Sequence, residues 1–174
     1  MIRSASSEDL PVLRDIERAA GAPFRTLGMT SIAEDEPPSI EELAAYQRAG
    51  RAWVCTDERD RPVAYLLAEI VDGFAHIEQV SVRPSHARRG LGRSLIDAVD
   101  GWAADHGLAG LTLTTYAEVP WNAPYYERLN FEIVDDAELS DGLRTIRRHE
   151  AARGLDAWPR VVMRRTPSTS TVDA

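Results

Sequence analysis

Residues 78–95 read Glu-Gln-Val-Ser-Val-Arg-Pro-Ser-His-Ala-Arg-Arg-Gly-Leu-Gly-Arg-Ser-Leu, a strand pattern followed by a glycine turn and a helix pattern. Pro84 cannot continue a paired strand, and apolar residues beyond the turn recur at helical spacing. Gly90 and Gly92 leave the first amide groups of the predicted helix open to a ligand. Because these amides lie at the positive end of the helix dipole, the turn suits a pyrophosphate.

Glycine pairs of this kind also occur in two nucleotide-binding motifs and in ordinary strand-to-helix turns. The P-loop needs a lysine, and this chain contains none. The dinucleotide fingerprint needs a third glycine and a preceding βαβ unit, and neither is present in the sequence pattern. Three arginines surround the two glycines, although a purely structural turn does not need them. They favour an anionic ligand.

Residues 82–84 and 89–92, Val-Arg-Pro and Arg-Gly-Leu-Gly, resemble the acyl-CoA pyrophosphate motif of the GNAT superfamily of N-acetyltransferases. The family usually has Gln or Arg three residues before the first glycine, where this chain has Ala87. This departure removes one side-chain contact and leaves the backbone cradle. Residues 122–131 resemble the family element Asn-x-x-x-Tyr-x-x-x-Gly-Phe, with Asn130 in place of glycine. Asn is the non-Gly residue that best tolerates positive φ.

The resemblance covers most of residues 1–165 and implies one domain with an α/β (α+β) fold. We expect a mixed, mostly antiparallel sheet of about seven strands flanked by helices, and a disordered low-complexity tail over residues 166–174. The implied activity is transfer of an acetyl group from acetyl-CoA to a primary amine, by direct attack in a ternary complex. The alternative is a module of the same fold that binds acyl-CoA as a sensor without turnover.

The resemblance assigns cofactor binding to a strand, to the glycine turn and to one further residue. The strand residues are Val80, Ser81 and Val82, the first and last of which would pair with the pantetheine amides. The residues of the turn are Arg88, Arg89, Gly90, Leu91, Gly92, Arg93 and Ser94. Asn122 would contact the cofactor, although the residue can equally be only a helix cap.

Two residues are candidates for catalysis. Glu78 is the candidate base, because burial beside Ile77 and Val80 would raise its pKa towards neutrality. The alternatives are a water, Glu118 as the base, or a purely structural role for Glu78 in an ion pair. Tyr126 is the candidate acid, since a phenol keeps its proton at neutral pH and can protonate a thiolate. The neighbouring Tyr125 is expected to pack in the core.

Residues 22–38 are predicted to be a connector without helix, and their acidic, proline-containing end is either solvated or part of a substrate lid. In the second case Phe24 and Met29 would contact the acceptor. Near the C-terminus, Ser140 is expected to cap a helix over residues 141–153. The arginines of that helix are expected to face solvent. They are Arg144, Arg147 and Arg148.

The net charge of −8 argues against broad binding to nucleic acid or to anionic membranes and favours a small-molecule or peptide amine as acceptor. The single cysteine, Cys55, excludes an internal disulfide, and no metal cofactor is expected. Without a long apolar run or a signal-like N-terminus, a cytoplasmic location is the default expectation. A homodimer is possible.

Overall fold

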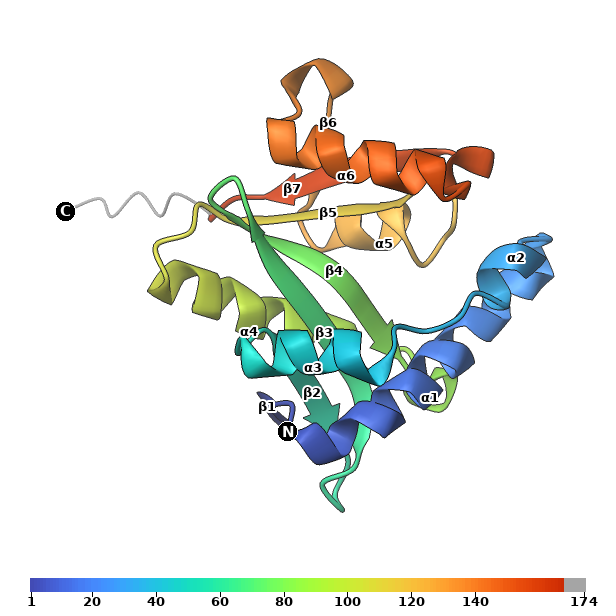
Figure 1. The fold of residues 1–174 in the computed structure, drawn as a ribbon, viewed down its shortest axis with the longest axis vertical. Helices are drawn as coiled ribbons and strands as arrows, with labels where there is room; N and C mark the ends of the chain where they lie inside the picture. The colour runs from blue at the N-terminus through green and yellow to red at the C-terminus, as the bar shows by residue number, and fades with distance from the viewer. Residues whose placement is uncertain (168–174) are drawn as a thin grey trace. The chain divides into compact units, whose positions relative to one another are not determined.

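The computed structural model describes residues 1–167, so most of the expected tail lies outside the described residues. The strands are β1 Ile2–Ser4, β2 Ala52–Thr56, β3 Pro62–Val71, β4 Phe74–Val82, β5 Leu111–Tyr116, β6 Glu132–Val134 and β7 Arg160–Arg165 (Figure 1). The α-helices are α1 Leu10–Gly21, α2 Thr30–Ala33, α3 Ile40–Arg48, α4 Leu91–Asp105, α5 Ala123–Arg128 and α6 Asp141–Ala152. Within residues 1–167, no helix has both the length and the apolar character that crossing a membrane requires.

The strands hydrogen-bond in the order β1-β2-β3-β4-β5-β7-β6. Strand β4 pairs with β5 in parallel, while the pairs β1–β2, β2–β3, β5–β7 and β6–β7 are antiparallel. The predicted mixed, mostly antiparallel sheet of seven strands is therefore confirmed. The chain divides into two compact units, Met1–Glu69 with Glu78–Val99, and Ile70–Ile77 with Asp100–Ala174.

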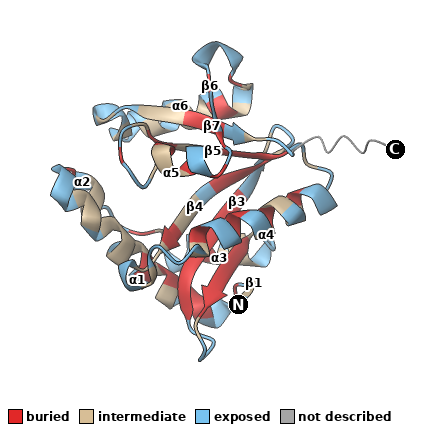
Figure 2. Cartoon of the chain, turned by 180° about the vertical axis from the view of Figure 1, so that it is seen from behind, coloured by how far each residue is buried: buried red, intermediate tan, exposed pale blue. Residues whose placement is uncertain are grey.

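The core of the first unit is built from apolar side chains that α1 and α3 place on one face of β2 and β3 (Figure 1). Leu13 and Ile16 of α1 are fully buried there, as their helical spacing predicts. Strand β2 is buried along its whole length (Figure 2), so its alternate residues line the opposite face. Cys55 on that face is a buried free thiol and packs in the interior.

Local sequence signals start the first helices. Ser6 precedes the 3₁₀ turn Ser7–Asp9, and the Asp9 carboxylate accepts hydrogen bonds from the amide and the hydroxyl of Ser6 at 2.8 and 3.1 Å. At the start of α3 the Ser39 hydroxyl accepts from the amide of Glu42 at 3.1 Å. The Ser39 pattern therefore caps α3 itself, whereas the Ser6 pattern caps the 3₁₀ turn that leads into α1.

The prediction that residues 22–38 contain no helix is wrong for the first part of that segment. A 3₁₀ helix, Ala22–Leu27, follows α1 directly and ends at Gly28, whose φ of 73° is left-handed. The short helix α2 comes next, and only the acidic end of the segment has no helix. Pro23 suits the first turn of a helix, where its missing N–H would have no partner.

In the second unit, α6 packs Leu143 against Val134 and Val162 of the strands. Ser140 occupies the position before α6, but its hydroxyl does not form the expected capping bond. Asp72, from the turn between β3 and β4, caps the helix instead by accepting from the amide of Gly142 at 2.8 Å. Seventy residues separate these two partners in the chain, so local sequence patterns do not reveal the cap.

One of the three arginines of α6 does not face solvent as predicted. Arg147 donates to Glu150 at 3.0 Å and to Asp156 at 2.8 Å. Glu150 also accepts from Arg160 at 2.9 Å, and both Glu150 and Arg160 are nearly buried. The helix therefore uses Arg147 to complete a buried ion-pair network, because a buried carboxylate needs cationic partners.

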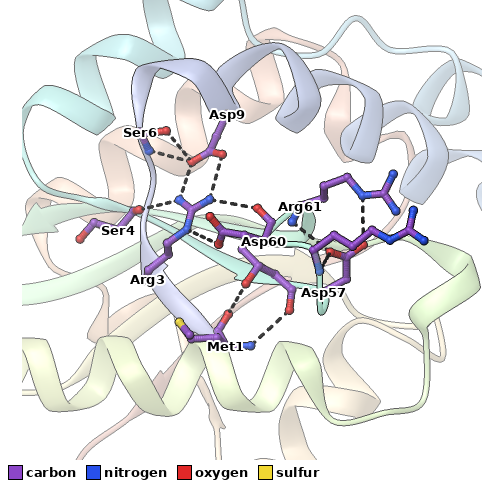
Figure 3. Close-up of polar contacts among 10 residues, drawn as sticks. Met1, Arg3, Ser4, Ser6, Asp9, Asp57, Asp60 and Arg61 are labelled. Atoms are coloured by element: carbon purple, nitrogen blue, oxygen red, sulfur yellow. Dashed lines mark hydrogen bonds and ion pairs between the residues drawn. The ribbon is translucent and has the colours of Figure 1, made fainter.

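Arg3 joins the first strand to two acidic residues (Figure 3). Its guanidinium donates to both oxygens of Asp9, at 2.7 and 3.1 Å, and to Asp60 at 3.0 Å. Burial alone would raise the pKa of Asp9, but hydrogen bonds from Arg3 and Ser6 hold it below its usual value. The ion pair therefore stabilises the ionised form of a nearly buried carboxylate.

Gly142→Ala should destabilise the protein, because an added Cβ would lie 2.6 Å from the Asp72 carboxylate and 2.7 Å from Val71. Displacing the capping carboxylate should lower the free energy of unfolding, measured in urea, by about 1–2 kcal/mol. Gly101→Ala in α4 is the matched control, since nothing lies within 4 Å of its added Cβ. It should raise the free energy by about 0.5–1 kcal/mol. Equal effects of the two changes would contradict the assigned cap.

Arg3→Leu should lower the free energy of unfolding at pH 7 by roughly 1.5–3 kcal/mol, the usual range for hydrogen bonds to a charged group. The folded-state pKa of Asp9 is depressed, so its contribution is present above the unfolded pKa and is lost as the pH falls through the folded pKa. The gap between wild type and variant should shrink accordingly in acid. Arg61→Ala, at an exposed ion pair with Asp57, should change stability by less than about 0.5 kcal/mol.

Candidate active site

The segment from β4 to α4 has the conformation that its sequence predicts. The strand ends at Val82, the 3₁₀ turn Pro84–His86 follows, and α4 begins at Leu91. Gly90 has φ of 74°, and a Cβ added there would meet nothing within 4 Å. The start of α4 therefore borders open space, as a bound phosphate requires.

The charged side chains around this turn are available for an anion. Within the described part of the chain neither Arg88 nor Arg89 forms an ion pair, and both are exposed. Arg93 lies 3.9 Å from Asp97 and is also exposed. Leu91 is half-buried, Gly92 is buried and Ser94 is exposed, with its hydroxyl bonded to the carbonyl of Gly90. The turn can hold a phosphate through backbone amides and through two unpaired guanidinium groups.

Strand β4 continues beyond its pairing with β5. The paired residues are Ala75 with Leu111 and His76 with Thr112, whereas β4 extends to Val82. Val80 and Val82 are half-buried, and Ser81 is buried. His76 is buried and its Nδ1 lies 2.9 Å from the Thr112 hydroxyl, which identifies it as a structural residue.

Glu78 lies on β4 and is exposed, so the expectation that its carboxylate is buried is wrong. Its negative charge nevertheless acts on Tyr46 of α3. Burial first, then a 2.8 Å hydrogen bond to Glu69, and then the charge of Glu78 raise the pKa of the Tyr46 phenol above its usual value. Two carboxylates, those of Glu69 and Glu78, therefore act on this phenol.

A polar network beside β4 was not anticipated from the sequence. Gln79 donates to the Ser81 hydroxyl at 2.7 Å, and Ser81 donates to Oε2 of Glu17 at 2.8 Å. The Tyr65 hydroxyl donates to the same oxygen at 2.6 Å. A sequence signal did exist, because Glu17 falls at helical spacing from Leu13 on the apolar stripe of α1.

In the second unit, α5 carries two of the predicted site residues. The Oδ1 atom of Asn122 is buried and has no hydrogen-bond partner within residues 1–167, and the side chain does not cap α5. The interpretation of Asn122 as only a helix cap is therefore wrong. Asn130 has φ of 69°, which confirms that it replaces a glycine in a left-handed position.

Tyr126 is 7% exposed and packs edge-to-face on Phe131 and Tyr125. Burial raises the pKa of its phenol well above the usual value, so the hydroxyl keeps its proton. Tyr125 is only half-buried and lies under the guanidinium of Arg128. The expectation that Tyr125 is the packing residue of the pair is therefore wrong, because the ring of Tyr126 is the more deeply buried.

The remaining candidates lie in loops and in the segment after α1. Phe24 is half-buried, whereas Met29 is 2% exposed and belongs to the interior. Glu118 is exposed in the loop after β5. In residues 1–167 no group of three or more His, Cys, Asp and Glu side chains is placed to hold a metal ion.

Comparisons with known proteins agree with this arrangement. Residues 13–131 match the model of the acetyltransferase (GNAT) family. The uncharacterized N-acetyltransferase YjcF of Bacillus subtilis (strain 168) is 24% identical over 110 residues, which are 63% of this chain and 76% of that protein.

Two solved structures show the same fold. The PaiA N-acetyltransferase from Thermoplasma acidophilum in complex with coenzyme A has a TM-score of 0.69 at 15% identity, over 96% of this chain and 98% of that chain. The ribosomal-protein-alanine N-acetyltransferase from Brucella melitensis has a TM-score of 0.67 at 19% identity, over 96% and 99%. With the family model matched over most of its length, the chain belongs to the GNAT family of acetyltransferases, which use acetyl-CoA.

Proposed function

We propose that this enzyme transfers the acetyl group of acetyl-CoA directly to a primary amine in a ternary complex. The observation that carries the proposal is the start of α4, where Gly90 faces open space and two unpaired arginines accompany the free amides. A pyrophosphate satisfies both the helix dipole and the two positive charges. No covalent enzyme intermediate is proposed, because the only cysteine is buried and structural.

The proposed cofactor site uses the residues that the resemblance assigned. The pyrophosphate would bind the turn from Arg88 to Ser94, and the pantetheine would pair with the backbone of Val80 and Val82. The buried, unpartnered Oδ1 of Asn122 supports its role, since a buried acceptor without a donor is costly and an amide N–H of the cofactor would satisfy it.

The proposed reaction needs one proton acceptor and one donor. Glu78, directly or through a water, takes a proton from the amine, and the neutral nitrogen then attacks the thioester carbon. The carbon–sulfur bond breaks, and Tyr126 gives its proton to the departing thiolate. The acylated nitrogen then loses its surplus proton, which restores the Tyr126 phenol directly or through water. A phenol with a raised pKa is protonated at neutral pH, so Tyr126 carries the proton that this step requires.

A panel of primary amines tests the function directly. The intact protein is incubated with acetyl-CoA and each amine, and thiol release is followed while acetyl-CoA binding is measured by calorimetry. Acceptor-dependent release of CoA supports the proposed transfer. Binding of acetyl-CoA without release in the presence of any amine would instead identify a sensor module.

Ser94→Glu tests the pyrophosphate site. The new carboxylate lies in the first turn of α4, where it should stabilise the helix, yet it would repel the phosphates. We expect the dissociation constant of acetyl-CoA to rise at least roughly fivefold, since adjacent like charges cost about 1 kcal/mol or more. Ala104→Glu, exposed near the other end of α4, is the control and should leave binding unchanged. Equal affinity in the two variants would place the pyrophosphate elsewhere.

Tyr126→Phe tests the proposed acid. The ring packing on Phe131 should survive, and turnover should fall by roughly 10²-fold, the lower end for general acid catalysis. Acetyl-CoA affinity should stay within a few-fold, because the lost interaction forms mainly in the transition state. Tyr125→Phe is the matched control and should keep normal turnover. A silent Tyr126→Phe would remove the assigned acid.

Glu78→Gln tests the proposed base. Turnover should fall by roughly 10²- to 10⁴-fold, and the acidic limb of the pH–rate profile should disappear. Glu69→Gln, which removes the neighbouring exposed carboxylate, should retain that limb. If Glu78→Gln keeps both the limb and a near-normal rate, the proton is taken by Glu118 or by water alone.

A further inference from the structure

The carboxylate of Glu17 is held on one side by neutral donors. Its Oε2 atom accepts from the hydroxyls of Tyr65 and Ser81, at 2.6 and 2.8 Å. Both donors are buried, and Gln79 fixes the direction of the Ser81 proton by donating to its oxygen. Burial and the adjacent charge of Glu17 raise the pKa of Tyr65 well above its usual value, so the phenol remains a donor. The side chain of Glu17 is therefore rigidly placed.

This carboxylate differs from the other shielded ones in the chain. Asp9 receives Arg3 at 2.7 Å, and Glu150 receives both Arg147 and Arg160 at 3.0 and 2.9 Å. Among residues 1–167, no arginine lies within ion-pair distance of Glu17. A partly buried carboxylate normally has a cationic partner. The 20 arginines of this chain supply such partners to Asp9 and Glu150, but not to Glu17.

The second oxygen of Glu17 is not fully buried. Oε1 accepts no hydrogen bond from a described residue and is not among the buried atoms that lack a partner, so it reaches solvent. The hydrogen bonds to Oε2 thus hold the side chain in place, while Oε1 is left for a ligand. A fixed, open carboxylate without a counter-charge suits a cation from outside the chain.

We propose that Glu17 binds a positively charged group of the acceptor, so that the preferred acceptors are diamines. The inference rests on the proposed function. Gln79 and Ser81 flank Val80, one of the strand residues proposed to hold the pantetheine, which puts the carboxylate beside the proposed cofactor strand. The attacking nitrogen must be neutral, and the cation at Glu17 is therefore a second ammonium of the same molecule.

Matched acceptor pairs test the proposal. Butylamine is compared with 1,4-diaminobutane, and benzylamine with 4-(aminomethyl)benzylamine, at saturating acetyl-CoA. The wild type should show the lower KM for the diamine of each pair. Glu17→Gln keeps an oxygen for the Tyr65 and Ser81 bonds and removes only the charge. It should raise the diamine KM roughly 10- to 100-fold, as for a lost charged hydrogen bond, with kcat and the monoamine KM little changed.

Asp15→Asn on the exposed side of the same helix is the control and should behave as wild type. A wild type that acetylates neither diamine or prefers the monoamines overturns the proposal, as does a Glu17→Gln variant that affects both members of a pair alike. If the wider amine panel gives no CoA release at all, the proposed function fails as well. Release with other amines and none with the diamines leaves the function intact and removes only the role of Glu17.

Discussion

Strand β4 is the constraint on which the two compact units and the proposed chemistry depend. Its first residues belong to one unit, where it pairs in parallel with β5 and buries His76 against Thr112. Its later residues belong to the other unit, where Ser81 closes the hydrogen-bond network with Glu17 and Tyr65. Strand β3 pairs with β4 on one side, whereas the parallel pairing with β5 on the other side involves Ala75 and His76, which leaves the β5-facing edge of the later residues for other partners.

Shielded carboxylates in this molecule differ in whether they have an arginine partner. Shielded carboxylates such as Asp9 and Glu150 have arginine partners, because an unpaired charge away from water is costly. Arg88 and Arg89 before α4 and Glu17 on α1 are among the charged groups of residues 1–167 that have no ion-pair partner. The two arginines are positive, and the ligand proposed for them is a negative pyrophosphate. Glu17 is negative, and the ligand proposed for it is a positive ammonium group.

Local sequence chemistry predicted the elements whose stability is local. Gly90 and Asn130 have positive φ, as expected because Gly and Asn are the residues that adopt it most readily. The cap at Ser39 is expected from the spacing of Ser39 to Glu42. The 3₁₀ helix after α1 escaped prediction because polar and apolar residues alternate there without helical periodicity. The site residues were located by family resemblance, and the exposure of Glu78 and the burial of Tyr126 could not be deduced from neighbours in the sequence alone.

The sequence by itself determined the strand–turn–helix around Gly90 and the family, because these depend on backbone preference and short spacing. Only the tertiary structure decided which charges are neutralised. Asp72 caps α6 across 70 residues, Arg147 turns inward to Glu150, and Glu17 is left with hydroxyls instead of an arginine. Such partnerships are set by which elements pack together, and no local pattern in the chain encodes them.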